Sequence, residues 1–252
     1  MALRDIMGAI GGLCDSASRS RGVGNAISTA QQLIGRLDRS SGGDRGTAAA
    51  RDAGAPGPVY PENTVFLNVY DITEANNVLY HAGLGVHHTG VEVYGMEIAF
   101  GRCEEGPGVF QTMPKQTEPH IFREQLVLGE TQLTREQVCS LVEEFRANTT
   151  QWSGRAYHLI RNNCNCFSEA FAKRLLPPDL RKQQQEQKLV EVYDGGEREE
   201  VQLENGEKVS LPVIMPSWVN NLARSATRFL PNGAVDKMEE MDMASQRSRN
   251  AA

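Results

Sequence analysis

Apolar and polar positions alternate along the first part of the chain that shows a regular pattern. Residues 64–71 (TVFLNVYD) form a β-rich run closed by a polar stretch, which predicts a first strand. Residues 91–93 and 98–100 alternate about a turn at Gly95, so two antiparallel strands joined as a hairpin are expected. Two shorter patterns complete this region, with strands predicted at 108–112 and 122–128 and a break at 129–131.

Helical spacing follows. Thr134 and Gln137 have the spacing of a capping box, and a helix is predicted there with the apolar stripe Val138, Leu141, Val142 and Phe145. A strand-like run at 156–160 leads into a second amphipathic helix that ends before Pro177. Cys164 therefore lies at or near a helix N-terminus. Residues 215–223 place a proline before a third helix start.

Composition divides the chain into five parts. Residues 1–62 are rich in Gly, Ser, Ala and Arg, so we expect a low-complexity tail in which residues 27–37 form a transient helix or, less favoured, a docking element. The other predicted parts are a domain core at 63–178, a charged insertion at 179–212, a C-terminal helical part of the domain at 213–230, and a tail at 231–252.

Charge and cysteine usage narrow the compartment and the partners. The formal net charge of −6 argues against nucleic acid or an anionic membrane surface as a partner, since both need clustered Lys and Arg. No run approaches the ~18 apolar residues of a membrane-spanning helix, and residues 1–5 lack the build of a secretory signal. Five cysteines without dense spacing favour a reducing compartment. We expect a cytoplasmic protein, with the nucleus also open, and no stable membrane insertion.

Cys164 is the candidate nucleophile. On a helical wheel it shares the apolar face of Phe167 and Phe171, whereas Cys166 is turned well over a right angle away. A helix N-terminus favours the thiolate, and its free N–H groups suit an oxyanion hole. The hairpin offers His87 and His88 as the base.

Structural roles for the same residues remain open, because a lone cysteine near a helix start is commonly a small buried hydrophobe and a lone histidine a hydrogen-bonded one. A zinc site is disfavoured, because the sequence has neither a second cysteine pair nor a His-x3-His spacing. We expect neither a metal nor another cofactor.

Several short motifs stand out along the chain: VYD at 69–71, HTGVEVYG at 88–95, EIAFG at 97–101, VLG at 127–129, GRAYHL at 154–159 and NCNCFS at 163–168. Taken together, they resemble the PPPDE, or DeSI-type, isopeptidase family over residues 65–171 and again at 215–223. The resemblance implies a circularly permuted papain-like fold of the α+β class, in which an antiparallel sheet packs against helices and the nucleophile begins a helix. It assigns His88 and Cys164 as a catalytic dyad, and His87 does not match the family's histidine.

The function that this resemblance implies is removal of ubiquitin or a SUMO-like modifier from protein lysines through a thioester acyl-enzyme. Protein S-depalmitoylation, lipid acyl transfer and an inactive modifier-binding module remain alternatives. Asn165 argues against the lipid group, whose members typically carry a glutamate after the cysteine. Three features depart from the pattern: Cys166, the long N-terminal tail and the insertion. A homodimer is left open, and the absence of an amide or carboxylate in residues 99–101 favours a dyad over a triad.

Overall fold

The computed structural model describes residues 58–72, 87–117, 119–188 and 190–220. The predictions for the two tails and the 27–37 helix therefore lie outside the described residues, apart from residues 58–62.

A five-stranded antiparallel sheet forms the centre of the described part and has the strand order β4-β3-β2-β1-β5. Its strands are β1 (Thr64–Asp71), β2 (His87–Val93), β3 (Met96–Phe100), β4 (Val109–Thr112) and β5 (Ile121–Glu130). All the strands predicted from residues 64–128 are confirmed. The predicted break at 129–131 is wrong in part, because β5 continues through Gly129, whose φ of 146° accompanies a register shift against Val65.

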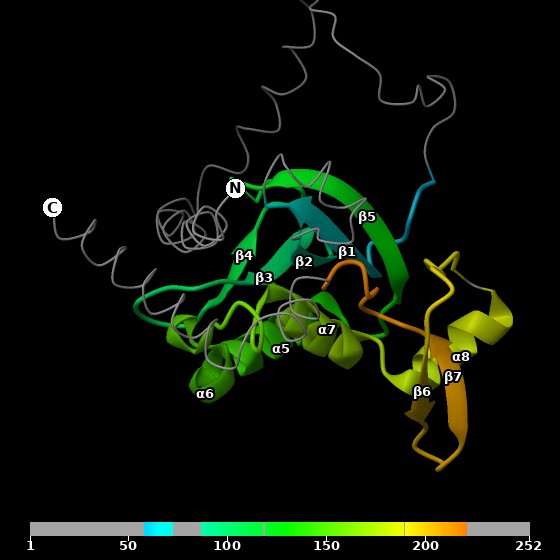
Figure 1. The fold of residues 1–252 in the computed structure, drawn as a ribbon. Coiled ribbons are helices and arrows are strands. Elements are labelled where there is room, and N and C mark those ends of the chain that lie inside the picture. Colours follow the sequence, from blue (N-terminus) through cyan, green and yellow to red (C-terminus); the bar gives the residue numbers. More distant parts are fainter. Residues whose placement is uncertain (1–57, 73–86, 118, 189, 221–252) are drawn as a thin grey trace, which may run out of the picture.

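Three helices lie beneath one face of this sheet (Figure 1). They are α5 (Arg135–Ala147), α6 (Thr149–Trp152) and α7 (Cys164–Leu175), and the predicted capping box of α5 is present at Thr134 and Gln137. Aromatic rings fill the space between helices and sheet, with Phe167 at 0% exposure in contact with Phe100, Phe145, Trp152 and Phe171. The described part thus has the predicted α+β class, with an antiparallel sheet packed against helices.

The segment before α7 is not the strand predicted at 156–160. A short 3₁₀ helix, η3 (Gly154–Ala156), is followed by a loop. In this loop the backbone N–H groups of Ile160 and Arg161 donate hydrogen bonds to Nδ1 of His158. Tyr157 and Leu159 are buried, which explains the alternating pattern. The alternation reflects core contacts from a loop rather than a sheet ladder.

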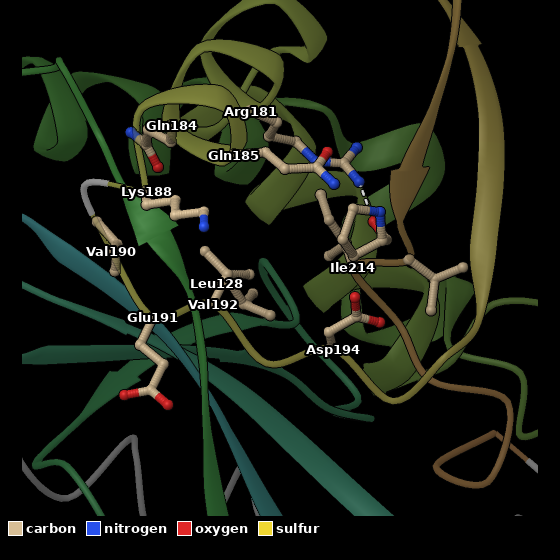
Figure 2. A pocket seen from close by; sticks show the side chains of 12 residues that line it. Leu128, Arg181, Gln184, Gln185, Lys188, Val190, Glu191, Val192, Asp194 and Ile214 are labelled. Atoms are coloured by element: carbon tan, nitrogen blue, oxygen red, sulfur yellow. Dashed lines mark hydrogen bonds between the residues drawn. The ribbon is translucent and has the colours of Figure 1, made fainter.

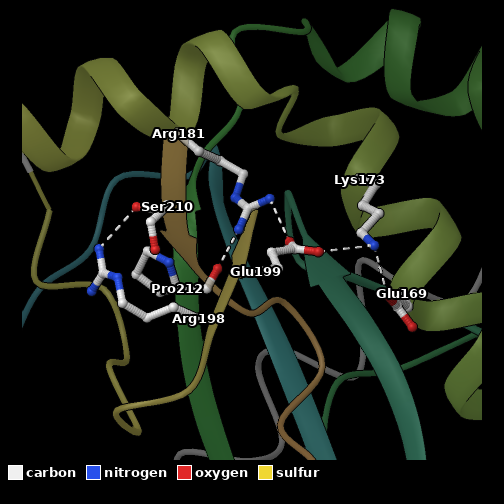
Figure 3. Close-up of polar contacts among 7 residues, drawn as sticks. All are labelled: Glu169, Lys173, Arg181, Arg198, Glu199, Ser210 and Pro212. Carbon is white, nitrogen blue, oxygen red and sulfur yellow. Dashed lines mark hydrogen bonds and ion pairs between the residues drawn. The ribbon is translucent and has the colours of Figure 1, made fainter. Parts of the chain in front are cut away.

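The predicted insertion contains helix α8 (Pro178–Gln187) and a hairpin of β6 (Arg198–Gln202) and β7 (Lys208–Pro212). Ion pairs fasten this hairpin to the helices (Figure 3): Glu199 lies 2.9 Å from Arg181 of α8 and 3.3 Å from Lys173 of α7. Arg181 also donates to the carbonyl of Pro212. In the predicted third helix, described residues 217–220 form a turn in which Val219 N–H donates to the Pro216 carbonyl, and the rest lies outside the described residues.

Among the residues that the structure describes, no helix is both long and apolar enough to cross a membrane.

Candidate active site

Cys164 is the first residue of α7, and Asn163 caps the helix. The Asn163 side chain accepts a hydrogen bond from Cys166 N–H at 3.0 Å and donates one to the Leu159 carbonyl at 2.8 Å. This cap therefore ties the helix start to the preceding loop. Cys164 is 3% exposed, so its thiol is buried at the helix N-terminus that the sequence predicted.

Three donors surround the Cys164 sulfur. The backbone N–H groups of Thr89 and Asn165 and the hydroxyl of Tyr157 hydrogen-bond to it, and each favours the thiolate. Burial opposes them and is the larger effect, so the pKa of the Cys164 thiol is raised to about 11. The helix start alone therefore does not make a resting thiolate, and a base is needed to remove the proton near neutral pH.

Tyr157 is a site residue that the sequence analysis missed. Its ring packs 5.3 Å from that of Phe100 and under the Arg102 guanidinium at 5.8 Å. Burial, then the nearby Cys164, raises the pKa of its hydroxyl well above the usual range, so the group stays protonated as a donor. Its only sequence signal was its place in the segment at 154–159.

Strand β2 is fastened to α7 by buried polar side chains. The Thr89 hydroxyl donates to Asn165 Oδ1 and Ser168 Oγ, each at 3.0 Å, and the Cys164 thiol points to the same Asn165 oxygen at 3.7 Å. Asn165 Nδ2 donates to the Val219 carbonyl at 3.5 Å. Asn165 thus links the strand, the helix start and the 217–220 turn.

His88 lies on β2 directly before Thr89, whose backbone N–H contacts the Cys164 sulfur, but the His88 ring faces the other side of the sheet. Thr89 points toward α7, and neighbouring strand residues alternate between faces. The His88 ring contacts Tyr70, with centroids 6.0 Å apart, and His120, with centroids 5.0 Å apart. It is completely buried, and neither ring nitrogen has a hydrogen-bond partner among the described residues. Burial, then His120, holds its pKa well below the usual range.

The covalent geometry still keeps His88 close to Cys164. The Thr89 N–H that contacts the sulfur belongs to the peptide bond between His88 and Thr89. The His88 Cα, which carries the imidazole side chain, therefore flanks the same peptide bond whose N–H contacts the sulfur. The structure brings together Cys164 and the His88 backbone, and it gives no hydrogen bond between the two side chains.

His87 lies on the helix-bearing face of β2. It is opposite Asp71 in the strand register, and its Nδ1 is 3.2 Å from an Asp71 oxygen. Asp71 also pairs with Arg123 at 3.2 Å, and the His87 ring meets that of Trp218 edge-on at 5.2 Å. Burial lowers the pKa of His87, against the opposing effect of Asp71. His87 thus lies between a carboxylate and an indole ring, in an environment that gives it a structural role.

The far face of the sheet contains a buried carboxylate, Glu97, at 0% exposure. It accepts hydrogen bonds from Asn68 at 2.6 Å, Tyr70 at 2.7 Å and the Lys115 backbone at 3.0 Å. A Cβ on Gly90 would lie 2.3 Å from Glu97, so only glycine leaves room for this side chain. Burial raises the pKa of Glu97 in spite of its donors.

A pocket of about 340 Å³ lies away from the cysteine, between α8, the 188–194 segment and the end of β7 (Figure 2). Leu128 and Ile214 contribute to its apolar lining, and Lys188 and Glu191 are among its charged residues. Neither Cys164 nor His88 lines it. No group of three or more potential metal ligands occurs in the described ranges.

A buried cysteine at a helix start, packed against a histidine-bearing strand, is the class of arrangement that cysteine peptidases use. Residues 63–185 match the family model described as PPPDE putative peptidase domain. This match confirms, for this part of the chain, the resemblance to the PPPDE family that was drawn from the sequence motifs.

Three relatives support this assignment. A DeSI-like protein of Arabidopsis thaliana is 38% identical over 112 residues, which are 44% of this chain and 49% of the relative. A desumoylating isopeptidase 1 homolog of Caenorhabditis elegans is 37% identical over 128 residues, 47% of this chain and 36% of the relative. A DeSI-like protein of Schizosaccharomyces pombe is 33% identical over 117 residues, 44% of this chain and 57% of the relative. The chain thus matches between 36% and 57% of the length of these relatives.

Proposed function

We propose that this chain is a thiol-dependent isopeptidase that removes ubiquitin or a SUMO-like modifier from protein lysines, with Cys164 as nucleophile and His88 as base. One observation carries the proposal: within a PPPDE domain, the buried Cys164 sulfur contacts the backbone N–H of Thr89, the residue that follows His88. The name of the C. elegans relative, a desumoylating isopeptidase 1 homolog, favours SUMO among the modifiers.

In the proposed reaction, His88 takes the proton of the Cys164 thiol, and the thiolate attacks the carbonyl carbon of the isopeptide bond. The carbon–nitrogen bond breaks, and the lysine amine leaves with the proton from His88. Water then attacks the thioester, with its proton passing to His88, and the sulfur leaves and is reprotonated. The Asn165 N–H, one of the donors at the sulfur, is suited to stabilise the oxyanion.

The proposal includes a change in the His88 side chain. Its ring nitrogens have no hydrogen-bond partner in the described part of the chain, so a shift of the start of β2 together with a turn of the ring toward Cys164 breaks no hydrogen bond of the ring described there. Catalytic contacts are commonly loose in a resting enzyme and tighten with substrate. A circularly permuted papain-like fold is part of the same proposal, because the histidine precedes the cysteine in the chain. We place this activity in the cytoplasm, with the nucleus open.

Covalent labelling tests the proposal. Wild type, Cys164→Ser and His88→Ala are incubated with ubiquitin and SUMO that carry an electrophilic C-terminus, beside a palmitoyl-like probe. His87→Ala and Cys166→Ser are the matched controls, because each alters the neighbouring histidine or cysteine. We expect labelling by one modifier, its loss in Cys164→Ser, and a fall of about a hundredfold or more in His88→Ala.

Other outcomes would change the assignment. Labelling by the lipid probe alone would support thioester hydrolysis, as in S-depalmitoylation. Labelling by no probe would support an inactive modifier-binding module. Loss in His87→Ala but not in His88→Ala would transfer the role of base to the histidine on the helix-bearing face.

A further inference from the structure

His120 is a second buried histidine beside the proposed base. It is the last residue of the connection that runs from β4 over the far face of the sheet to β5, which begins at Ile121. This connection is fastened to Glu97 by the Lys115 backbone at 3.0 Å and the Thr117 hydroxyl at 3.3 Å. His120 N–H in turn donates to the Thr117 carbonyl at 2.9 Å. Its backbone is thus held in place over the strand that carries His88.

The two histidines are buried side by side, and their ring nitrogens lack hydrogen-bond partners. His88 is 0% and His120 8% exposed, their ring centroids are 5.0 Å apart, and their planes differ by 33°. None of their four ring nitrogens has a hydrogen-bond partner in the part of the chain that the structure describes. Buried polar atoms without partners are costly, so such a pair beside a proposed active site calls for a functional explanation.

We propose that His120 is a positioning residue for His88: its neutral ring accepts a hydrogen bond from the outer nitrogen of His88 while the inner nitrogen takes the Cys164 proton. The inference rests on the proposed function, in which His88 is the base. It replaces the expected dyad with a group of three, in which an imidazole has the role that an amide or carboxylate has in other cysteine and serine hydrolases.

The separation and the charge state suit this role. A centroid spacing of 5.0 Å lets nitrogen atoms on facing edges approach hydrogen-bond distance after a modest rotation. Burial lowers the pKa of His120 to about 4, so at neutral pH it keeps a lone pair for the hydrogen bond. Once His88 becomes an imidazolium, a neutral acceptor stabilises its buried charge, whereas a second imidazolium would repel it.

Other titratable groups near the pair are fixed by their own contacts. Tyr70 packs on His88 and donates to Glu97, and burial raises the pKa of both groups. Lys115 lies over the Phe122 ring at 5.5 Å, and Asp71 is on the opposite face with His87. His120 therefore offers the acceptor nitrogen next to the His88 ring.

The test measures how fast iodoacetamide alkylates Cys164 from pH 5 to 9, followed by peptide mass spectrometry so that the other cysteines are resolved. His120→Phe keeps a ring but removes the acceptor, and His120→Gln restores an acceptor oxygen. We expect the Phe variant to react about tenfold to a hundredfold more slowly near neutral pH, and the Gln variant to recover most of the rate. Met113→Ala, at a position of the same connection that is 64% exposed, is the matched control and should react like wild type.

His88→Ala separates the two proposals. If it slows alkylation while His120→Phe keeps the wild-type rate and pH profile, the positioning role is overturned and the base remains. If His88→Ala reacts like wild type, the base is wrong and the positioning role falls with it. Should the Phe variant not fold, His120→Leu repeats the measurement, and a slow Leu variant that Gln does not recover also overturns the proposal.

Discussion

At the scale of single residues, the most consequential atom is the Cys164 sulfur, whose pKa is set by a balance between burial and three donors. Only one of the donors is a side chain, the Tyr157 hydroxyl, so only that one can be removed by substitution without altering the backbone. The contribution of the site to thiolate formation is therefore open to direct measurement.

Replacing Tyr157 with Phe should slow alkylation of Cys164 about tenfold at pH 8, because a hydrogen bond to a charged group is worth about 1.5–3 kcal/mol. The measurement is the site-resolved rate with iodoacetamide. Tyr94→Phe is the control, because it also loses a hydroxyl, one that donates to the Leu133 carbonyl at 2.7 Å. Equal rates in the two variants would show that Tyr157 has no influence on the thiol.

His120 should also make the fold sensitive to acid. Its pKa is about 4 in the folded state against 6.5 ordinarily, so the unfolded chain binds a proton first as the pH falls below 6.5. Stability is thus lost between pH 6.5 and 4, and by pH 5 this histidine accounts for about 2 kcal/mol. His120→Phe should lose less stability than wild type between pH 7 and 5 by about that amount, measured by urea unfolding at both values. Parallel pH profiles would refute the burial of a neutral ring.

Residue-level features mark the limit of what the sequence could predict. The position of Cys164 at a helix start follows from local spacing, and the structure agrees. The raised pKa of its thiol, the Tyr157 hydroxyl and the His120 ring depend on segments that meet only in the folded chain, and a sequence pattern does not encode their distances. The face of His88 could have been read from its alternation with Thr89, although the partners on that face could not.

At the scale of elements, local signals were reliable where one rule acted alone. The capping box at Thr134 and the alternation in β1 to β4 each predicted their element. The rule failed at 156–160, where Tyr157 and Leu159 point into the core from a loop, and at Gly129, where a bulge continues a strand that glycine was expected to end. Burial produces the same alternation in a loop as in a strand.

The start of α7 offers an element-level prediction. Asn163→Ala removes both the acceptor for Cys166 N–H and the donor to the Leu159 carbonyl, so it should cost about 1–2 kcal/mol and alter the alkylation rate of Cys164. Urea unfolding and the iodoacetamide rate are measured together. Thr134→Ala, which removes the N-cap of α5, should cost a similar amount and leave the rate unchanged. A rate change in both variants would mean that it reports lost stability rather than the position of the thiol.

At the scale of the whole molecule, the described chain has a sheet-and-helix unit and, beside it, the β6–β7 hairpin (Figure 1). The family model ends at residue 185, so the hairpin and much of the lining of the 340 Å³ pocket lie beyond it. Arg181 of α8 connects the two parts, because it is 9% exposed and contacts both Glu199 and the Pro212 carbonyl. The hairpin is thus joined to the helices by ion pairs and also has the buried side chains of Leu203 and Leu211, whereas the sheet has an aromatic core.

Arg181→Leu tests whether the hairpin opens separately from the rest. The change removes a buried charge pair and leaves Glu199 with Lys173 at 3.3 Å, so we expect local opening rather than global unfolding. Hydrogen exchange followed by mass spectrometry should show faster exchange in 198–212 and unchanged protection in β1 to β3. Lys182→Leu, which removes an exposed pair with Glu207 at 2.9 Å, is the control and should alter little. If exchange rises equally in the sheet, the hairpin belongs to the same cooperative unit as the proposed active site. A substitution at the pocket would then affect Cys164 only by changing the global stability of the chain.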